Sequence, residues 1–389
     1  MSDQLIDAEE LVRRYTPTEL AETAEAYMAA VTDWGYHLAK PLGSPVEAPV
    51  ILAHFAAMLA ALQLQPGHRV LDFGAGSCWT SRMIAQTGCH VIACDVSETG
   101  LAMGRKLFEL QPPIGSGTAE FLLFDGYHLD LPDASVDRIS VMDAFHHVPN
   151  WREVLTEFLR VLRPGGRVVM AEGGPHHSRT PQAQEEMRNF TVVERDMVVE
   201  DFAALAAEVG FVDTLVAIYA GIPHLVPAAQ FTEELQNGAT ARHAAIAFLD
   251  NHRLIALDKG GEAELTSRSP VGLAAAIRLE SVDGRRLTVV VENVGTATWL
   301  GASARIGVVN LGVQLFDAAG RRLDLDFMRV ALRPDGSATV APGESVRLSF
   351  EVPVPDVRPF RLTLDLVSEG VAWFANIGAS SPVQTDVLG

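Results

Sequence analysis

The residues with the clearest chemical meaning form a glycine turn near residue 75. The segment 70–79 begins with apolar residues, places an acid at Asp72 and then turns through Gly74 and Gly76. Glycines let the backbone turn tightly and approach a ligand, and a helix that begins there presents unpaired N–H groups. Asp95 ends the next apolar run, 23 residues after Asp72. An acid at a spacing of about 20 meets ribose hydroxyls in nucleotide-binding folds, so the pattern predicts a site for a nucleotide-like ligand.

The form of the turn discriminates between cofactors. It reads Asp-x-Gly-x-Gly rather than Gly-x-Gly-x-x-Gly, and an aspartate in the turn would repel the pyrophosphate of a dinucleotide. S-adenosylmethionine has no phosphate, and its positive sulfonium and amino groups tolerate a nearby acid. The turn resembles motif I of the class I methyltransferases, with Cys78 where the fuller form of the motif has a third glycine. This resemblance implies S-adenosylmethionine as the cofactor and a Rossmann-like α/β sheet.

Further landmarks of that family follow in the expected order. The segment 121–126 resembles the third strand with its adenine-contacting acid, and 136–143 resembles the fourth strand. A helical pattern over 151–162, a Pro-Gly-Gly stop and the apolar run 168–170 predict a helix and a fifth strand. Ligands of such sheets bind at the carboxyl ends of the strands. The resemblance therefore assigns the following residues to the cofactor pocket: Asp72, Phe73, Gly74, Ala75, Gly76, Cys78, Asp95, Val96, Asp125, Gly126 and Asp143.

Histidines are the candidates for acid–base chemistry. His146 and His147 follow the predicted fourth strand, and a second pair that begins at His176 follows the fifth. Methyl transfer to a hydroxyl needs positioning and a base, and the histidine pKa suits a base near neutral pH. We expect His146, His147 and His176 to be catalytic, with Glu172 and Glu194 as weaker candidates. A metal site is not expected, because the acid–histidine spacing matches no standard ligand set.

Length, charge and cysteine content restrict the class of protein. The chain has 389 residues. This exceeds the roughly 250 to 300 at which a single core stops growing, so two domains are expected. A formal net charge of −19 without a Lys/Arg cluster disfavours a nucleic-acid partner. The three cysteines give neither zinc spacing nor a disulfide framework. With no export signal in the first four residues and no membrane-spanning run, a cytoplasmic location is expected.

Other elements must position this chemistry. Residues 1–66 have mostly helical patterns and are expected to cap the cofactor pocket of a methyltransferase domain over 67–264. A polar segment between 172 and 196 fits a lid. A helix is expected over 199–209, an added strand over 211–219, and a reversed seventh strand over 252–257.

From residue 270 the pattern changes to period 2. Short strand-like runs are separated by Asp-Gly, Gly and Pro-Gly signals, which predicts an antiparallel β-sandwich over 270–389. Three segments resemble the β-sandwich of bacterial surface-polysaccharide proteins, such as the carbohydrate-binding domain of O-antigen export ATPases: 292–299, 342–344 and 365–374. Trp299, Trp373 and Phe374 could stack on sugar rings, although buried tryptophans are also common in sandwich cores.

Together these patterns predict a methyltransferase dependent on S-adenosylmethionine that methylates a hydroxyl, with a bacterial surface glycan or glycoconjugate as the expected acceptor. One alternative is a small-molecule methyltransferase of secondary metabolism, in which the sandwich serves structure or homo-oligomerisation. Another is a non-catalytic glycan-binding protein. The intact Asp72, Gly74, Gly76 and Asp95 argue against the loss of catalysis.

Overall fold

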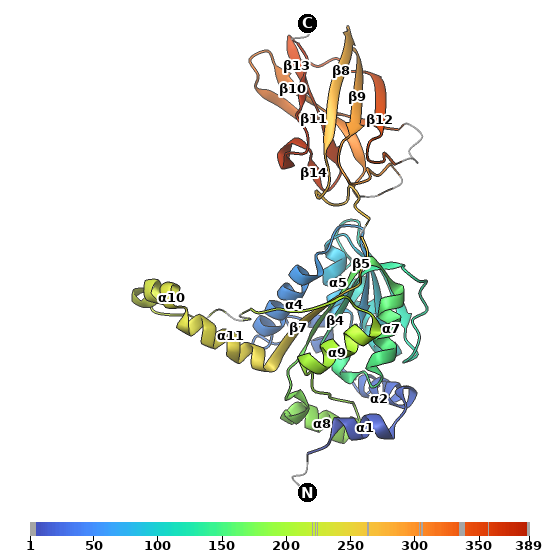
Figure 1. The fold of residues 1–389 in the computed structure, drawn as a ribbon, viewed down its shortest axis with the longest axis vertical. Coiled ribbons are helices and arrows are strands. Elements are labelled where there is room, and N and C mark those ends of the chain that lie inside the picture. The colour runs from blue at the N-terminus through green and yellow to red at the C-terminus, as the bar shows by residue number, and fades with distance from the viewer. Residues whose placement is uncertain are drawn as a thin grey trace. The chain divides into compact units, whose positions relative to one another are not determined.

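The chain divides into two compact units, each with its own core (Figure 1). The computed structural model describes residues 5–219, 221, 223, 225–262, 264–302, 304, 306–333, 339–356 and 358–386. The first unit comprises Met1–Leu64 and His68–Ala263, and the second comprises Gln65–Gly67 and Glu264–Gly389. The first four residues, on which the expectation about an export signal rests, lie outside the described part. Among the described helices, none has the length and apolar character needed to cross a membrane.

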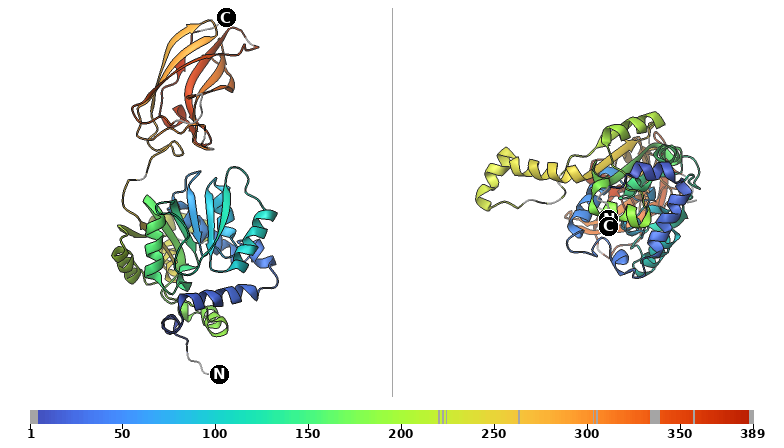
Figure 2. Two further views of the ribbon diagram at one scale, coloured as in Figure 1. Left: turned by 90° about the vertical axis from the view of Figure 1, so that its right-hand side faces the viewer. Right: turned by 90° about the horizontal axis from the view of Figure 1, so that it is seen from below.

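A seven-stranded sheet lies at the centre of the first unit, with the order β3-β2-β1-β4-β5-β7-β6 (Figure 2). Strands β1 to β5 are parallel, and β7 pairs antiparallel with both β5 and β6. The strands are β1 (Arg69–Phe73), β2 (His90–Asp95), β3 (Thr118–Leu123), β4 (Val136–Met142), β5 (Leu162–Gly173), β6 (Asp213–Val216) and β7 (His252–Asp258). The predicted Rossmann-like fold class is confirmed.

Both faces of this sheet are covered, because its central strands carry nearly continuous apolar residues and successive side chains point to opposite faces. Leu71 and Phe73 of β1 face a core that α7 (Trp151–Val161) and α9 (Val199–Val209) complete. Val70 faces the opposite core, which α4 (Ala48–Leu62) and α5 (Trp79–Gln86) close. The remaining helices of the unit are α1 (Ala8–Arg14), α2 (Pro17–Ala29), α3 (Gly35–Ala39), α6 (Glu98–Leu110), α8 (Pro181–Phe190), α10 (Phe231–Asn237) and α11 (Ala239–Asn251).

Helices α1, α2 and α8 lie near the carboxyl ends of the parallel strands (Figure 1). Helix α2 begins with a capping box in which Thr16 and Glu19 satisfy each other's backbone N–H groups, and Pro17 occupies its first turn. Helix α8 lies within the segment predicted to be a lid. By contrast, α10 and α11 project from the unit and have no buried residue.

The second unit is a β-sandwich of two antiparallel sheets. One sheet has the order β11-β10-β13-β14, with β15 also paired to β13, and the other has the order β12-β9-β8. Its strands are β8 (Ala275–Asp283), β9 (Arg286–Asn293), β10 (Val309–Asp317), β11 (Arg322–Ala331), β12 (Ser345–Glu351), β13 (Phe360–Ser368), β14 (Ala372–Trp373) and β15 (Val383–Gln384). This agrees with the predicted sandwich fold.

The aromatic residues considered for sugar stacking are mainly core residues. Trp299 and Phe374 are fully buried and meet edge to face, with ring centroids 5.6 Å apart. Trp373 lies against Gly312, where a Cβ would come within 2.4 Å of its ring, and the guanidinium of Arg329 lies 4.5 Å from the ring centroid. Trp299 and Phe374 therefore cannot stack on a sugar, and Arg329 already occupies a position over the Trp373 ring.

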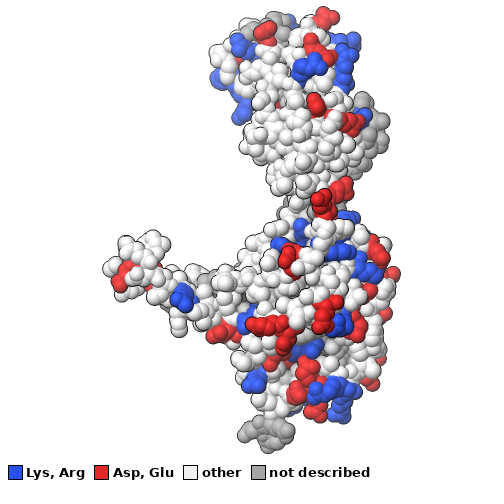
Figure 3. All heavy atoms as spheres, in the orientation of Figure 1, with Lys and Arg blue, Asp and Glu red and all other residues white. Residues whose placement is uncertain are grey.

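Acidic and basic side chains are interspersed over the first unit. On the face that Figure 3 shows, Lys and Arg groups alternate with Asp and Glu groups and do not merge into one basic surface. With the net charge of −19, this distribution gives no electrostatic footprint for a polyanion on the described residues of that face.

Candidate functional site

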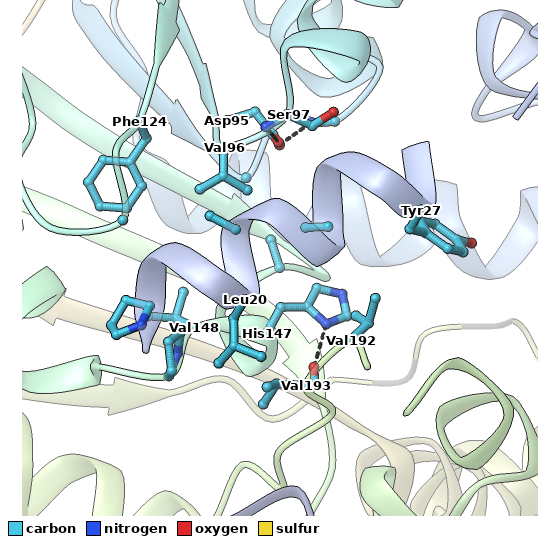
Figure 4. Close-up of a pocket in the computed structure, with 18 of the residues that line it drawn as sticks. Leu20, Tyr27, Asp95, Val96, Ser97, Phe124, His147, Val148, Val192 and Val193 are labelled. Atoms are coloured by element: carbon cyan, nitrogen blue, oxygen red, sulfur yellow. Dashed lines mark hydrogen bonds between the residues drawn. The ribbon is translucent and has the colours of Figure 1, made fainter. Parts of the chain in front are cut away.

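A cavity of about 230 Å³ lies beneath α2, at the carboxyl ends of β1 and β2. In the view of Figure 4, Asp95, Val96 and Phe124 lie on one side of α2, and His147 and Val192 lie on the other. The lining residues are Pro17, Leu20, Ala21, Ala24, Tyr27, Met28, Phe73, Gly74, Gly76, Asp95, Val96, Ser97, Phe124, Gly126, Ala144, His147, Val148, Pro149, Asn150, Glu186, Val192 and Val193.

The glycine turn after β1 forms one wall of this cavity. Gly74 and Gly76 have φ values of +69° and +51°, a conformation that favours glycine. A Cβ at Gly74 would lie 2.3 Å from the Cβ of Ala144, so only glycine fits there. At Gly76, an added Cβ would meet no atom of the described residues within 4 Å, apart from those of its own chain neighbours. The backbone of the turn is thus open to a ligand at Gly76.

Asp95 ends β2 at the edge of the same wall. Its carboxylate accepts hydrogen bonds from the N–H groups of Gly76 and Ser97, at 2.7 Å and 2.8 Å. Burial raises the pKa of Asp95 although these two bonds oppose the shift. Each carboxylate oxygen accepts one of these bonds and keeps a further lone pair. The acid and the open turn therefore fit a ligand that has ribose hydroxyls but no phosphate, such as S-adenosylmethionine.

Asp72 belongs to the same sequence motif but points into the protein. It is 1% exposed and does not line the cavity. Its carboxylate accepts hydrogen bonds from the hydroxyls of Thr80, Ser81 and Ser140, at 2.7, 2.5 and 2.7 Å. These bonds join β1 to α5 and β4. Burial raises the pKa of Asp72, and the hydroxyl bonds oppose that shift.

The other predicted cofactor residues divide into two groups. Phe73, Val96 and Gly126 line the cavity, whereas the following do not: Ala75, Cys78, Asp125 and Asp143. Cys78 is buried with φ +59°, so it retains the backbone conformation that a glycine would adopt there. The Asp125 side chain accepts from the N–H groups of the next turn, at residues 127 and 128. Asp143 is exposed and also has a positive φ, of +49°.

Helix α2 is fastened over the cavity by one acid that the sequence patterns did not indicate. Glu25 accepts hydrogen bonds from the Ser97 hydroxyl at 2.5 Å and from both the N–H and the hydroxyl of Thr99, at 3.1 and 2.5 Å. Partial burial opposes the charged form of Glu25, but these bonds outweigh it and lower the pKa. On the α8 side, the rings of Tyr27 and Phe190 meet edge to face at 5.0 Å.

Three histidines gather around Glu194 at the opposite wall. The Nε2 atoms of His146 and His177 lie 3.6 Å and 2.7 Å from Oε2 of Glu194, and Nδ1 of His147 lies 3.4 Å from Oε1. Of the three predicted catalytic histidines, His147 lines the cavity and His146 is buried behind it. His176 is exposed and belongs to neither the cavity lining nor this cluster. Its neighbour His177, rather than His176, lies beside Glu194.

Hydrogen bonds fix the rings of both adjacent histidines. Nδ1 of His146 bonds to Oε2 of Glu172 at 2.6 Å, and Nδ1 of His147 bonds to the carbonyl oxygen of Val193 at 2.7 Å. A carbonyl only accepts, so His147 carries its proton on Nδ1 when neutral, and its lone pair lies on Nε2. Glu172 also accepts from the N–H of Phe145 at 2.8 Å. This buried acid therefore holds both the His146 ring and the loop after β4.

Burial and charge act in opposite directions within the cluster. Burial disfavours protonated His146, but the hydrogen bond to Glu172 and the charges of Glu172 and Glu194 raise its pKa to about 9. Burial, with the positive charge of His146, lowers the pKa of His147. Burial also opposes ionised Glu194, but the neighbouring His147 and His177 help to lower its pKa to about 2. The arrangement therefore places an ionised carboxylate between imidazoles, behind His147, which lines the cavity.

Comparison with known proteins supports this description of the first unit. Residues 71–170 match the family described as "Methyltransferase domain". The match includes the turn after β1, the acid that ends β2, and the two histidines that follow β4. It therefore contains the Asp95 and His147 walls of the cavity.

Among curated relatives, the demethylmenaquinone methyltransferase of Clavibacter sepedonicus is 38% identical over 106 residues, which cover 27% of this chain and 41% of that protein. The enzyme of the same name from Beutenbergia cavernae is 36% identical over 116 residues, with 30% and 45% covered. The chain thus spans less than half the length of these two relatives.

Solved structures with a similar fold include a methyltransferase from Mesorhizobium loti that depends on S-adenosylmethionine. It is 22% identical, with a TM-score of 0.41, and covers 53% of this chain and 98% of that one. A cyclopropane synthase from Mycobacterium tuberculosis is 19% identical, with a TM-score of 0.44 and coverage of 61% and 98%. The family match, the open glycine turn and the acid after β2 identify S-adenosylmethionine as the cofactor of the first unit.

Proposed function

We propose that this chain, which contains a methyltransferase domain at residues 71–170, transfers the methyl group of S-adenosylmethionine to a hydroxyl of a small, largely apolar acceptor. The observation that carries the proposal is one cavity with two chemically different walls. Asp95 and the turn at Gly76 lie at one wall, and His147 lies at the other. The two walls suit a cofactor and an acceptor held side by side, which is the arrangement that methyl transfer requires.

On the cofactor side, Asp95 would accept hydrogen bonds from the ribose hydroxyls, and the open backbone at Gly76 would lie against the ligand. Val96 and Phe124 offer apolar surfaces for the adenine ring. When bound, S-adenosylmethionine supplies an electrophilic methyl group on a positively charged sulfur. The role of these residues is to hold that group in line with the acceptor oxygen, because correct orientation supplies much of the rate enhancement.

On the acceptor side, most of the wall is apolar. The residues that form it are Pro17, Leu20, Ala21, Ala24, Met28, Val148, Pro149, Val192 and Val193. The polar groups there are few: Tyr27, His147, Asn150 and Glu186. A sugar would bring many hydroxyls that need hydrogen-bond partners on desolvation, whereas an apolar ring or chain with one hydroxyl would not. The wall therefore favours a lipophilic small molecule, and the name of the two relatives also refers to an acceptor that is not a glycan.

The acceptor hydroxyl must lose its proton while its oxygen bonds to the methyl carbon. The carbon–sulfur bond breaks in the same step, and its electron pair remains on sulfur. The histidine cluster around Glu194 lies at the wall where this proton would leave. A buried, ionised carboxylate with adjacent imidazoles can promote such a step.

The glycan acceptor favoured by the sequence depends on the sandwich. Its support is weaker because Trp299 and Phe374 lie in the core and are not available for stacking. The resemblance to polysaccharide-binding domains remains a proposal about the second unit alone. The small-molecule alternative agrees better with the apolar acceptor wall, and we adopt it.

Labelled S-adenosylmethionine tests the proposal. The chain is incubated with host extract that has been fractionated into polysaccharide, lipid-linked glycan, protein, and small molecules soluble in organic solvent. We expect label in the last fraction, and much less of it with Asp95→Asn when the labelled cofactor is kept below the raised Kd of this variant. Label in a glycan fraction would support the surface-glycan acceptor instead. If no fraction is labelled although S-adenosylhomocysteine binds normally, the catalytic proposal fails for acceptors of that host.

A further inference from the structure

We propose that His146, His147 and Glu194 form a binding site for one divalent transition-metal ion at the acceptor wall, with His177 placed to complete the ligand set. The ligand atoms of the first three residues all lie within 4.8 Å of one another. The site itself does not depend on the proposed function, whereas its chemical role does. The sequence did not predict it, because Glu194 lies far from the histidine pair along the chain.

The distances are close to those within a metal site. Nε2 of His146 and Oε2 of Glu194 are 3.6 Å apart, and Nε2 of His177 is 2.7 Å from the same oxygen. Two ligands held about 2.0–2.1 Å from one tetrahedral ion lie about 3.4 Å apart. Binding would therefore require the His177–Glu194 hydrogen bond to open. Because the ligand atoms of the other three residues lie within 4.8 Å of one another, the farthest pair would also have to approach by up to about 1.4 Å.

The hydrogen bonds of the two adjacent histidines resemble those that orient histidine ligands in metal sites. Metal-binding histidines usually donate their other ring N–H to a carboxylate or a backbone carbonyl, which orients the ring. Here Nδ1 of His146 bonds to Glu172 and Nδ1 of His147 bonds to the Val193 carbonyl. For His146, this bond leaves Nε2, which lies 3.6 Å from Glu194, as the ligand atom. For His147, the nitrogen that lies 3.4 Å from Glu194 is Nδ1 itself, so its ring would have to turn to present Nε2 to the same ion. Glu172 is fully buried and is therefore assigned as a positioning residue for His146.

Glu194 provides an independent indication of a missing ligand. Its side chain is 3% exposed, and among the described residues its Oε1 atom makes no hydrogen bond of good geometry, although Nδ1 of His147 lies 3.4 Å from it and the carboxyl of Glu186 lies beside Glu194. A buried carboxylate oxygen is costly to leave without a donor or a cation. A metal ion bound by Glu194 would satisfy this oxygen and share the negative charge.

The ligand chemistry indicates the class of ion and its use. Imidazole nitrogens with one carboxylate suit Zn²⁺, Fe²⁺, Co²⁺ or Mn²⁺ better than Mg²⁺ or Ca²⁺, which prefer oxygen ligands. Because His147 also lines the cavity, the ion would lie beside the acceptor. It would polarise the acceptor hydroxyl so that its proton is lost more readily to water, before the oxygen attacks the methyl carbon.

Metal titration of the full chain tests the site without any methyl acceptor. The protein is freed of metal with a chelator and titrated with Zn²⁺ by calorimetry. It is then titrated with Co²⁺, whose visible absorption reports a nitrogen-containing, low-coordination site. We expect one equivalent per chain for each ion. If neither ion binds, the histidines act as a hydrogen-bonded base network, and the proposal is overturned.

Three variants locate the ion. Glu194→Gln should lower Zn²⁺ affinity at least tenfold, and Glu172→Gln should lower it about 10- to 100-fold through the orientation of His146. His176→Ala removes a nearby exposed histidine and should leave affinity unchanged. Equal affinity in Glu194→Gln and wild type would overturn the assignment. Binding of S-adenosylhomocysteine is measured for each variant, because Asp95 and the turn lie on the other wall and report an intact fold.

This test separates the site from the proposed reaction. Metal binding without methyl transfer to any extract fraction would leave the site standing and count against the function. Methyl transfer by protein that binds neither ion would support the proposed function and overturn the metal site. For the combined proposal, we expect chelation to reduce the transfer rate at least tenfold and added metal to restore it.

Discussion

Two acids of one sequence motif have different surroundings in the structure. Asp95 faces the cavity and binds backbone N–H groups, whereas Asp72 faces the interior and accepts three hydroxyl hydrogen bonds. The difference arises from the strands that carry them. Asp72 precedes the end of β1, where its neighbour Phe73 lines the cavity, and successive side chains of a strand point to opposite faces.

Asp95→Asn is expected to weaken cofactor binding with little effect on the fold. A hydrogen bond to a charged group contributes about 1.5 to 3 kcal/mol, which corresponds to about a 10- to 100-fold increase in Kd. Calorimetric titration with S-adenosylhomocysteine measures this change. Asp125→Asn is the matched control, because Asp125 does not line the cavity and should retain affinity. An unchanged Kd for Asp95→Asn would refute the pocket as described.

Asp72→Ala is expected to act on stability. The substitution leaves the hydroxyls of Thr80, Ser81 and Ser140 without their acceptor inside the core, and buried unsatisfied groups cost about 1 to 3 kcal/mol each before they relax. We expect denaturant unfolding to show a loss of roughly 2 to 4 kcal/mol. Asp72→Asn retains an acceptor oxygen and should lose less. A direct ligand role for Asp72 would instead show as a large rise in Kd in a fully folded Asp72→Asn variant.

At the scale of single residues, the sequence predicted those site features that depend on neighbouring positions in the chain. The spacing between Asp72 and Asp95 placed the turn and the strand end, and both lie at the expected strand termini. It did not indicate that His177 rather than His176 would lie beside Glu194, because this depends on how the chain turns after β5. Neither did it give Glu25, which is 72 residues from its partner Ser97. Contacts between distant segments become visible only when the fold brings them together.

At the scale of elements, the N-terminal end of α5 packs against α6 through a small residue. A Cβ at Gly104 would lie 2.2 Å from Sγ of Cys78. Gly104→Ala should therefore lower the Tm by several degrees, since overpacking costs about 1 to 3 kcal/mol. In the double variant with Cys78→Gly, the sulfur is absent and part of the Tm should return. Equal Tm values for the single and double variants would show that this contact does not limit the packing.

Helix α2 is expected to hold the cavity closed in a pH-dependent manner. Folding lowers the pKa of Glu25 through its bonds to Ser97 and Thr99, so ionised Glu25 stabilises the folded state above its ordinary pKa of about 4.3. That contribution is lost as the pH falls through the lower folded value. The difference in unfolding free energy between wild type and Glu25→Gln should thus be largest near neutral pH and shrink below about pH 4. A constant difference across this range would contradict the role of Glu25.

The elements themselves were largely predictable. The helix at 199–209 and the reversed strand near 252–257 agree with α9 and β7, because apolar periodicity and glycine stops are local signals. The added strand expected over 211–219 is shorter, at Asp213–Val216, where the residues lie in register with β7; Val212 and Ala217 each add one backbone hydrogen bond to β7 beyond the strand ends. The pairing partner of a strand, not its composition, sets its length here.

At the scale of the whole molecule, the two units have separate cores. The core of the sandwich contains described residues from 273 to 374, and the cores of the first unit contain none of these. A chain that ends at residue 264 is therefore expected to fold and to bind S-adenosylhomocysteine within about twofold of the full-length Kd, a change below ~0.5 kcal/mol. Calorimetry on both proteins measures this. A tenfold loss of affinity would show that the sandwich supports the cofactor site.

The position of β7 in the sheet determines when this unit can be completed during synthesis. β7 lies between β5 and β6, although both precede it in the chain. Until residues 252–258 leave the ribosome, the backbone groups of β5 on one side and those of β6 have no strand to pair with. Such open edges invite pairing with other chains. A nascent chain stalled in the α10–α11 region should thus be a preferred client of chaperones, and the pocket beneath α2 would gain its full supporting sheet only near the end of the first unit's translation.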